Sequence, residues 1–242
     1  MPTFFSLKGV HKSFGGILAV NDVDLDVSPG EIIGLIGPNG AGKTTLFHLI
    51  SGFYKPDRGT IFFNDIDLTG FRADQICKKG ISRAFQIVRP FIGLTVFENV
   101  LIGSFNRAQN KREAHQQCLQ TLELTGLSKF EDQLASHLTL AGKKRLEIAK
   151  ALSTNPEILL LDEVMAGLTQ TEMEEIMRLI RTINSKGITI IAIEHVMAAI
   201  MSLSQRIIVL NYGKKIAEGT PAEVADNKAV IDTYLGEERN IA

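Results

Sequence analysis

This sequence has few cysteines and almost no net charge. Its 242 residues include two cysteines, Cys77 and Cys118, and carry a formal net charge of -1. Because the cysteines show no metal-ligand spacing, we infer a reducing, cytosolic compartment in which both are packing residues. A charge so close to zero, with no basic run and no basic patch interleaved with aromatics, argues against a dedicated nucleic-acid-binding protein.

Long apolar runs are also missing. None approaches the ~20 residues that a helix needs to cross a bilayer. The first eight residues lack the basic region and apolar core of a signal peptide. We therefore expect a chain that is soluble by itself and that needs a partner for any work at a membrane. Its length allows one full core, either as a single domain or as a domain with an inserted subdomain.

One stretch fits the phosphate-binding pattern G-x-x-x-x-G-K-[ST] without a mismatch. Its glycines let the backbone aim N–H groups at phosphate oxygens, its lysine adds a positive charge, and its first threonine can ligate Mg²⁺. An apolar strand is expected over 31–36 and a helix over 44–50, so a triphosphate would meet a helix N-terminus. These flanks disfavour a glycine-rich turn with an incidental lysine. The residues are Gly37, Pro38, Asn39, Gly40, Ala41, Gly42, Lys43, Thr44 and Thr45.

The segments around this loop predict a small antiparallel β layer. Residues 4–10 and 20–27 are expected strands, the second with clear alternation, and 60–63 a third. The loop at 13–16 contains Phe14, which either stacks on a nucleotide base or is an ordinary core phenylalanine. A later strand ends at Gln86. This side chain either binds Mg²⁺ or the attacking water, or is an ordinary surface residue.

Residues 90–153 predict an inserted helical subdomain. The last of its helices is expected from about Lys143 to Leu152. Apolar periodicity places one face of this helix inward, and the opposite, basic face is expected to be solvated. The inward residues are Leu146, Ile148, Ala149 and Leu152, and the outward ones are Lys143, Lys144, Arg145 and Lys150.

An apolar run over 158–161 ends in Asp162 and Glu163, as in a parallel strand buried on both faces. Ligands lie beyond such strand ends, so Asp162 is a candidate Mg²⁺ ligand and Glu163 a candidate general base. A surface turn is the alternative. His195 follows another buried strand and either hydrogen-bonds the γ-phosphate or the attacking water, or only packs. Two more strands, 206–210 and 214–218, and a helical tail from 222 complete the predicted domain.

In this order the motifs resemble the ATP-binding subunits of ABC transporters, and the match covers nearly the whole chain. Within that family the chain looks like the LivG type of branched-chain amino acid importers, for example at 80–86, 95–100, 145–149 and 234–236. The resemblance implies an α/β P-loop NTPase fold with a mainly parallel core sheet, an antiparallel β layer and an inserted helical subdomain at about 90–153. It implies one nucleotide-binding domain over 1–242, with a C-terminal helical tail from about 220.

The resemblance also assigns roles to residues. Phe14 matches the adenine-stacking loop, 37–44 the Walker A motif, Gln86 the Q-loop and His195 the switch histidine. The signature falls at 138–142, where Thr139, Ala141 and Gly142 would contact ATP held by a partner subunit. Asp162 matches the Walker B aspartate, Glu163 the catalytic glutamate and 166–169 the D-loop.

The family mechanism implies the partners. Two ATPase subunits close head to tail over ATP and Mg²⁺ and drive two transmembrane permease subunits, with a solute-binding protein acting indirectly. The groove near 86–98 would receive a permease coupling helix. Such a subunit is peripheral, at the cytoplasmic face of the plasma membrane, and binds no nucleic acid.

Two departures from the family pattern affect the ATP site completed on the partner. The signature, usually Leu-Ser-Gly-Gly-Gln, is Leu-Thr-Leu-Ala-Gly at 138–142, which places a methyl group at Ala141 where close approach favours glycine. The D-loop ends in Thr169 instead of aspartate. We therefore expect a heterodimer with one slower site, although a homodimer stays open.

Several alternatives stay open at this stage. The chain could clamp ATP with little turnover, or serve a urea or amide importer or a lipopolysaccharide exporter. A soluble ABC ATPase acting on DNA or ribosomes is disfavoured by the single nucleotide-binding domain, the absence of coiled-coil insertions and the near-neutral charge.

Overall fold

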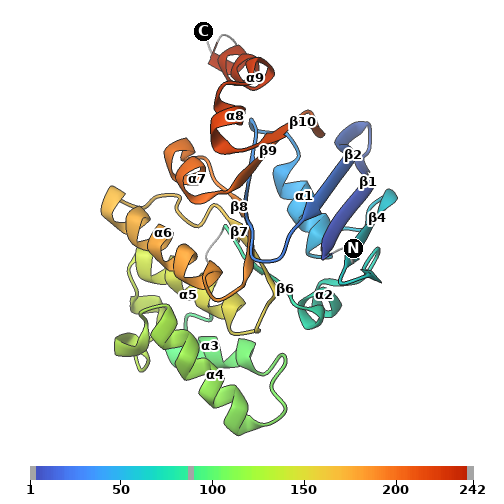
Figure 1. Cartoon of the computed structure of the whole chain (residues 1–242). Coiled ribbons are helices and arrows are strands. Elements are labelled where there is room, and N and C mark those ends of the chain that lie inside the picture. Colours follow the sequence, from blue (N-terminus) through green and yellow to red (C-terminus); the bar gives the residue numbers. More distant parts are fainter. Residues whose placement is uncertain (1–3, 87–89, 239–242) are drawn as a thin grey trace. The chain divides into compact units, whose positions relative to one another are not determined.

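The computed structural model describes residues 4–86 and 90–238. The chain divides into two compact units. Their helices and strands are labelled in Figure 1. Unit 1 comprises Met1–Ile76 and Ile191–Ala242, and unit 2 comprises Cys77–Ile190. Helix α2 (Ala73–Lys79) and strand β8 (Thr189–Ile193) each run across a boundary between the units.

Unit 1 contains an antiparallel sheet with the strand order β2-β1-β4-β5. Phe5 of β1 pairs with Val27 of β2 on one side and with Phe63 of β4 on the other, so apolar side chains face the same buried layer. The predicted antiparallel layer is confirmed. The strands are β1 (Phe5–Phe14), β2 (Ile17–Val27), β4 (Arg58–Phe63) and β5 (Ile66–Asp67).

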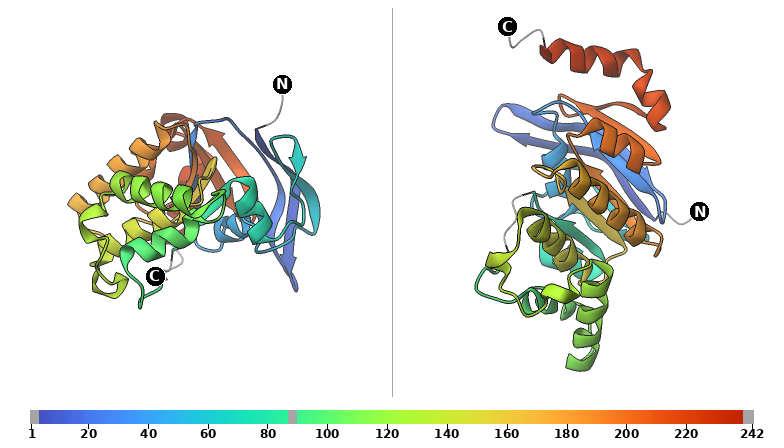
Figure 2. Two further views of the ribbon diagram at one scale, coloured as in Figure 1. Left: turned by 90° about the horizontal axis from the view of Figure 1, so that it is seen from below. Right: turned by 90° about the vertical axis from the view of Figure 1, so that its left-hand side faces the viewer.

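The second sheet of unit 1 holds the strand that leads into the phosphate loop. Strand β3 (Ile32–Ile36) pairs in parallel with β9 (Arg206–Asn211), and β10 (Lys214–Gly219) runs antiparallel to β9. All five residues of β3 are buried, as expected for a central parallel strand. Helices α8 (Pro221–Ala225) and α9 (Lys228–Glu238) both contact β10, at the red end of the chain in Figure 2.

Unit 2 combines a parallel strand pair with packed helices. Strands β6 (Ile81–Ala84) and β7 (Ile158–Asp162) run parallel, with Ile81 opposite Ile158 and Ala84 opposite Leu161. The mixed α/β fold with parallel and antiparallel sheets is therefore confirmed. The helices are α3 (Val96–Ser104), α4 (Lys111–Leu124), α5 (Leu140–Leu152) and α6 (Gln170–Asn184), with short 3-10 turns at Ser128–Phe130 and Ala135–His137.

An apolar cluster holds α3, α4 and α5 together, the green and yellow-green helices of Figures 1 and 2. It comprises Val96, Val100, Cys118, Leu122, Leu127, Ala135, Leu138, Leu146 and Ala149. Thr95 caps α3 in a capping box with Glu98, which fixes where the first of these helices begins. The extent of the helical subdomain, 90–153, stays a prediction.

Within the described residues, no helix is both long enough and apolar enough to cross a membrane.

A buried ion pair joins the two strands of unit 2. Arg83 of β6 donates to Asp162 of β7 over 2.5 Å, and their side chains are 4% and 2% exposed. We expect Arg83→Leu to lower the free energy of unfolding by about 3–5 kcal/mol, because the Asp162 carboxylate would stay buried without its compensating charge. Urea denaturation measures the change.

Arg72 provides the matched control, since it pairs with Asp74 over the similar distance of 3.0 Å but both side chains are exposed. Arg72→Leu should leave the urea midpoint almost unchanged, because water screens an exposed pair. If both variants lost the same free energy of unfolding, burial of the Arg83–Asp162 pair would not explain its contribution to stability.

The thiol of Cys118 is fully buried in the apolar cluster. Burial, and to a lesser extent the charge of Glu131, raises the pKa of this thiol to about 12. In a Cys77→Ser variant at pH 8 we expect iodoacetamide to alkylate folded Cys118 about 1,000-fold more slowly than in urea, because only the thiolate reacts. Since the pKa is raised in the folded state, this protection should hold below pH 9 and weaken as the pH approaches 12. Equal alkylation rates with and without urea would contradict the raised pKa of the buried Cys118 thiol.

Candidate functional site

The phosphate loop in unit 1 has a backbone that only glycine can adopt at two places. Gly37 has a φ of +148° and Gly42 a φ of +102°. A Cβ atom would lie 2.1 Å from the Leu210 carbonyl oxygen at Gly37, and 2.2 Å from the Ala19 carbonyl oxygen at Gly42. The two glycines of the motif are therefore required by both backbone conformation and space.

Lys43 lies at the centre of this loop. It is the first residue of α1 (Lys43–Ile50), whose N-cap is Gly42 and whose first N–H groups receive no side-chain cap. The buried Lys43 ammonium donates to the carbonyl oxygens of Gly37 (2.6 Å) and Pro38 (2.9 Å). An uncapped helix N-terminus beside an ammonium group favours an anion. The exposed residues of the loop are Asn39, Gly40 and Thr44.

Phe14 ends β1, and β2 begins at Ile17, so the loop expected over 13–16 is shortened to the hairpin turn at Gly15 and Gly16. Its side chain is 42% exposed, which excludes a core role. The ring meets the edge of Tyr54 at 5.1 Å, and the Lys12 ammonium lies 5.5 Å from its centroid. The same Lys12 ammonium donates a hydrogen bond to the Asp57 carboxylate over 2.7 Å. This bond is the main reason that the pKa of Asp57 is lowered to about 2.

His195 lies in the short connection between β8 and α7 (Met197–Leu203), as predicted for the end of a buried strand. All five residues of β8 are buried, whereas His195 is exposed. The imidazole is therefore accessible to a ligand.

Asp162, in unit 2, ends a strand in which every residue is buried. One carboxylate oxygen accepts from Arg83, and the other, Oδ1, is buried with no hydrogen-bond partner among the described residues. Such an oxygen needs a donor or a cation. The site therefore fits Mg²⁺, which prefers oxygen ligands and few protein carboxylates. In the same described ranges, no three His, Cys, Asp or Glu side chains gather into a metal site of their own.

Glu163 has a φ of +51°, an uncommon conformation for a residue other than glycine. Its carboxylate accepts from the Gln86 side-chain amide over 2.5 Å, so unit 2 brings together two of the predicted site residues. The Glu163 carbonyl accepts from the Lys144 ammonium (2.9 Å) and from the Ala166 N–H (3.3 Å).

The signature segment forms the start of α5. Thr139 is the N-cap, and its hydroxyl accepts from the Gly142 N–H over 3.2 Å. Leu140 is 49% exposed, and one of its methyl groups lies 3.3 Å from the ideal Cβ position of Gly167. The departure from the family signature thus places a leucine beside the D-loop segment.

Thr169, the other departure, is the N-cap of α6. It forms a capping box with Glu172, whose pKa is lowered first by the backbone N–H and then by the hydroxyl of Thr169. Aspartate would also cap this helix, so the change to threonine keeps the cap and removes one negative charge.

Three residues of these surroundings were missed or misplaced by sequence reasoning. No role was predicted from sequence for Arg83 or Tyr54. Lys144 was expected to face solvent, and this is wrong: it is 4% exposed and also donates to the Gln86 carbonyl oxygen over 3.2 Å. The burial of Leu146, Ile148, Ala149 and Leu152 is confirmed.

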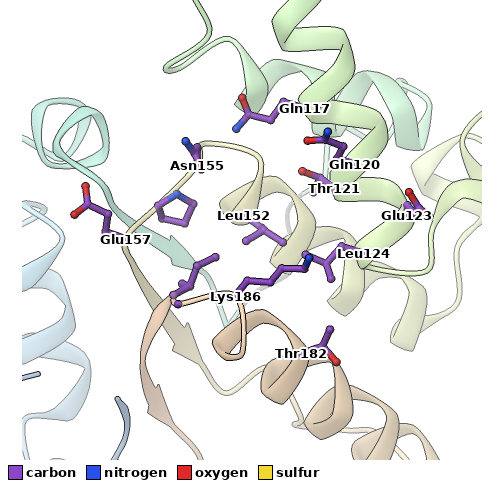
Figure 3. Close-up of a pocket in the computed structure, with 13 residues that line it drawn as sticks. Gln117, Gln120, Thr121, Glu123, Leu124, Leu152, Asn155, Glu157, Thr182 and Lys186 are labelled. Carbon is purple, nitrogen blue, oxygen red and sulfur yellow. The ribbon is translucent and has the colours of Figure 1, made fainter. Parts of the chain in front are cut away.

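A large open pocket in unit 2 contains none of the predicted site residues (Figure 3). Its volume is ≈ 860 Å³, and it is lined by α4, the α5–β7 connection and the end of α6. Gln117, Glu123 and Lys186 give the lining a mixed polar character.

Comparison with known proteins agrees with the geometry. Residues 20–166 match the family described as ABC transporter, and residues 214–240 match the one described as branched-chain amino acid ATP-binding cassette transporter. The chain is 44% identical to the high-affinity branched-chain amino acid transport ATP-binding protein LivG of Escherichia coli K12, over 96% of this chain and 97% of LivG. It is 32% identical, over the full length of both, to the lipopolysaccharide export ATP-binding protein LptB of Acidithiobacillus ferridurans.

The fold is also similar to a crystal structure of the ADP conformation of an ATP-binding cassette of an ABC transporter. The TM-score is 0.87 with 30% identity, and the similarity covers 98% of this chain and 99% of the other. Together with the phosphate loop and the buried strand that ends at Asp162, these similarities show that the chain belongs to the ABC transporter family and is an ATP-binding cassette of that family.

Proposed function

We propose that this chain binds ATP and Mg²⁺ and hydrolyses ATP to power an importer of branched-chain amino acids. The observation that carries the proposal is the phosphate loop: two sterically required glycines, an uncapped helix N-terminus and a buried ammonium group. The 44% identity to LivG supports the cargo class over lipopolysaccharide, since LptB is 32% identical. A urea or amide importer remains the second candidate for the same chemistry.

The site residues are proposed with the following roles. Backbone N–H groups of 37–45 and the Lys43 ammonium bind the phosphates, and Phe14 stacks on the adenine. Thr44, Gln86 and Asp162 ligate Mg²⁺, which when bound neutralises charge that develops on the phosphates. Glu163 orients the attacking water and takes its proton, and His195 hydrogen-bonds the γ-phosphate.

The Gln86 amide supports this role of Glu163, because it holds one carboxylate oxygen in a fixed direction. The position of a base matters for proton transfer, because a misplacement of about 1 Å lowers the rate about 100-fold. The left-handed backbone at Glu163 is a further feature typical of active sites.

We further propose the assembly in which this chemistry does work. Two permease subunits and a second ATPase subunit complete the complex at the cytoplasmic face of the plasma membrane, with a solute-binding protein outside. Thr139, Ala141 and Gly142 face the nucleotide of the partner ATPase. Because this signature carries a leucine and an alanine in place of two glycines, the partner is proposed to be a different chain.

The first test uses a tagged chain purified from detergent-solubilised membranes of its native host. We expect two multispanning permeases and a second ATPase to co-purify.

Glu163→Gln should lower the ATPase kcat of this complex about 10²–10⁴-fold, because the amide cannot accept a proton, and should abolish uptake of labelled leucine by cells. ATP binding should persist.

Glu123→Gln is the matched control, since Glu123 is an exposed acid on α4. Its ATPase rate should equal that of the wild type. If Glu163→Gln left the rate unchanged, the chain would be an ATP clamp without turnover. Co-purification with only ribosomal or DNA-repair proteins would overturn the transport proposal.

The second test concerns asymmetry between the two ATP sites. Replacing Leu140 and Ala141 with glycine restores the small residues that close approach to ATP favours. We expect the ATPase rate of the complex to rise about twofold, because two sites would turn over instead of one. Binding of ATP to the isolated chain should not change, since its own phosphate loop is untouched. An unchanged rate would contradict the proposed slow site.

A further inference from the structure

Lys144 is a buried cation in unit 2 that no motif accounts for. It is 4% exposed, although it lies in α5 between Lys143 and Arg145, where sequence predicts a solvated face. Removing an ammonium group from water is unfavourable unless hydrogen bonds replace the lost hydration. The contacts that Lys144 makes should therefore have a specific use.

Two of these contacts go to the backbone of the proposed hydrolytic residues. The ammonium donates to the carbonyl oxygen of Glu163 over 2.9 Å and to that of Gln86 over 3.2 Å. The Gln86 side chain in turn donates to the Glu163 carboxylate over 2.5 Å. The three residues form a closed ring of hydrogen bonds that joins α5, the end of the β6 segment and the end of β7.

The Glu163 backbone depends on this ring. A left-handed conformation at a residue other than glycine persists only where the surroundings hold it. The Glu163 carbonyl accepts from the Ala166 N–H at 3.3 Å, a long bond, and from the Lys144 ammonium at 2.9 Å. Loss of the ammonium would remove the shorter of these two bonds to the Glu163 backbone.

We propose that Lys144 is a positioning residue for Glu163, acting through the carbonyl oxygens of Glu163 and Gln86, and that it links the signature helix to the hydrolytic base. The inference rests on the proposed function, in which Glu163 is the base. Lys144 acts on backbone atoms of this chain and has no role in binding the nucleotide. Its removal should lower kcat and leave ATP affinity unchanged.

The test compares Lys144→Met, which keeps the length of the side chain and removes the donors, with Lys144→Arg, which keeps donors and charge. In the purified complex we expect Lys144→Met to lower kcat about 10–100-fold, with the Kd for ATP changed less than about threefold. Lys144→Arg should recover most of the rate. Lys111→Met, at an exposed lysine of α4, is the matched control and should behave as the wild type.

A double-mutant cycle shows whether Lys144 acts through Glu163. In a Glu163→Gln background, Lys144→Met should cause no further loss of kcat, because the residue being positioned is already inactive. Multiplicative losses would overturn the proposal and would indicate a separate structural role. A changed Kd with an unchanged kcat would also overturn it.

Hydrogen exchange in the isolated, nucleotide-free chain provides a readout that needs no ATPase activity. Lys144→Met should speed exchange in the segment 163–168, where the Ala166 N–H bonds to the Glu163 carbonyl, and Lys111→Met should not. Unchanged exchange in Lys144→Met would overturn the proposal. If Lys144→Met does not fold, Lys144→Gln, which stays polar but is one atom shorter and carries no charge, so that it cannot replace the ammonium at both carbonyl oxygens, is held to the same criteria.

The outcomes separate the two proposals. If Glu163→Gln inactivates the complex but Lys144→Met does not, only the positioning role fails. If the wild-type complex does not hydrolyse ATP, or if Glu163→Gln has no effect, the proposed function itself fails.

Discussion

Unit 2 can hold charged groups in its interior only because hydrogen bonds and opposite charges replace the water that those groups lose. Asp162 is buried beside Arg83, and Lys144 is buried against two carbonyl oxygens. Both arrangements lie at the end of β7, a strand with no exposed residue. The buried strand thus supports the compensated charges at its end, beside the two carboxylates that we propose to act in hydrolysis.

In unit 1, the anion-binding geometry of the phosphate loop comes mainly from the backbone. Its phosphate loop must present N–H groups to an anion, so it adopts conformations in which a Cβ atom would collide with the Leu210 and Ala19 carbonyl oxygens. The Lys43 ammonium is held by carbonyl oxygens of the same loop. Glycine at these places therefore reflects sterics, and the lysine supplies charge to a site that is otherwise built from dipoles.

The two departures from the family motifs preserve local structure while changing chemistry. Thr139 caps α5 and Thr169 caps α6, so both helices begin as they would with the usual residues. The altered groups are those that would face a partner: the side chains of Leu140 and Ala141, and the charge missing at Thr169. The helix caps are kept while the groups that would face a partner are changed. The proposed asymmetry between the two ATP sites therefore does not require a change in the fold.

The sequence by itself determined the phosphate loop and the strand that ends at Asp162, because periodicity and glycine requirements are local properties, and the order of its motifs determined the fold class through the family resemblance. Only the tertiary structure decided that Phe14 is exposed, that Arg83 pairs with Asp162 and that Lys144 points inward. Periodicity treats every lysine as a solvated residue, whereas the partners that allow Lys144 to be buried lie 58 and 19 residues away in the chain. The environment that compensates a buried charge is assembled from distant segments, so no local pattern reveals it.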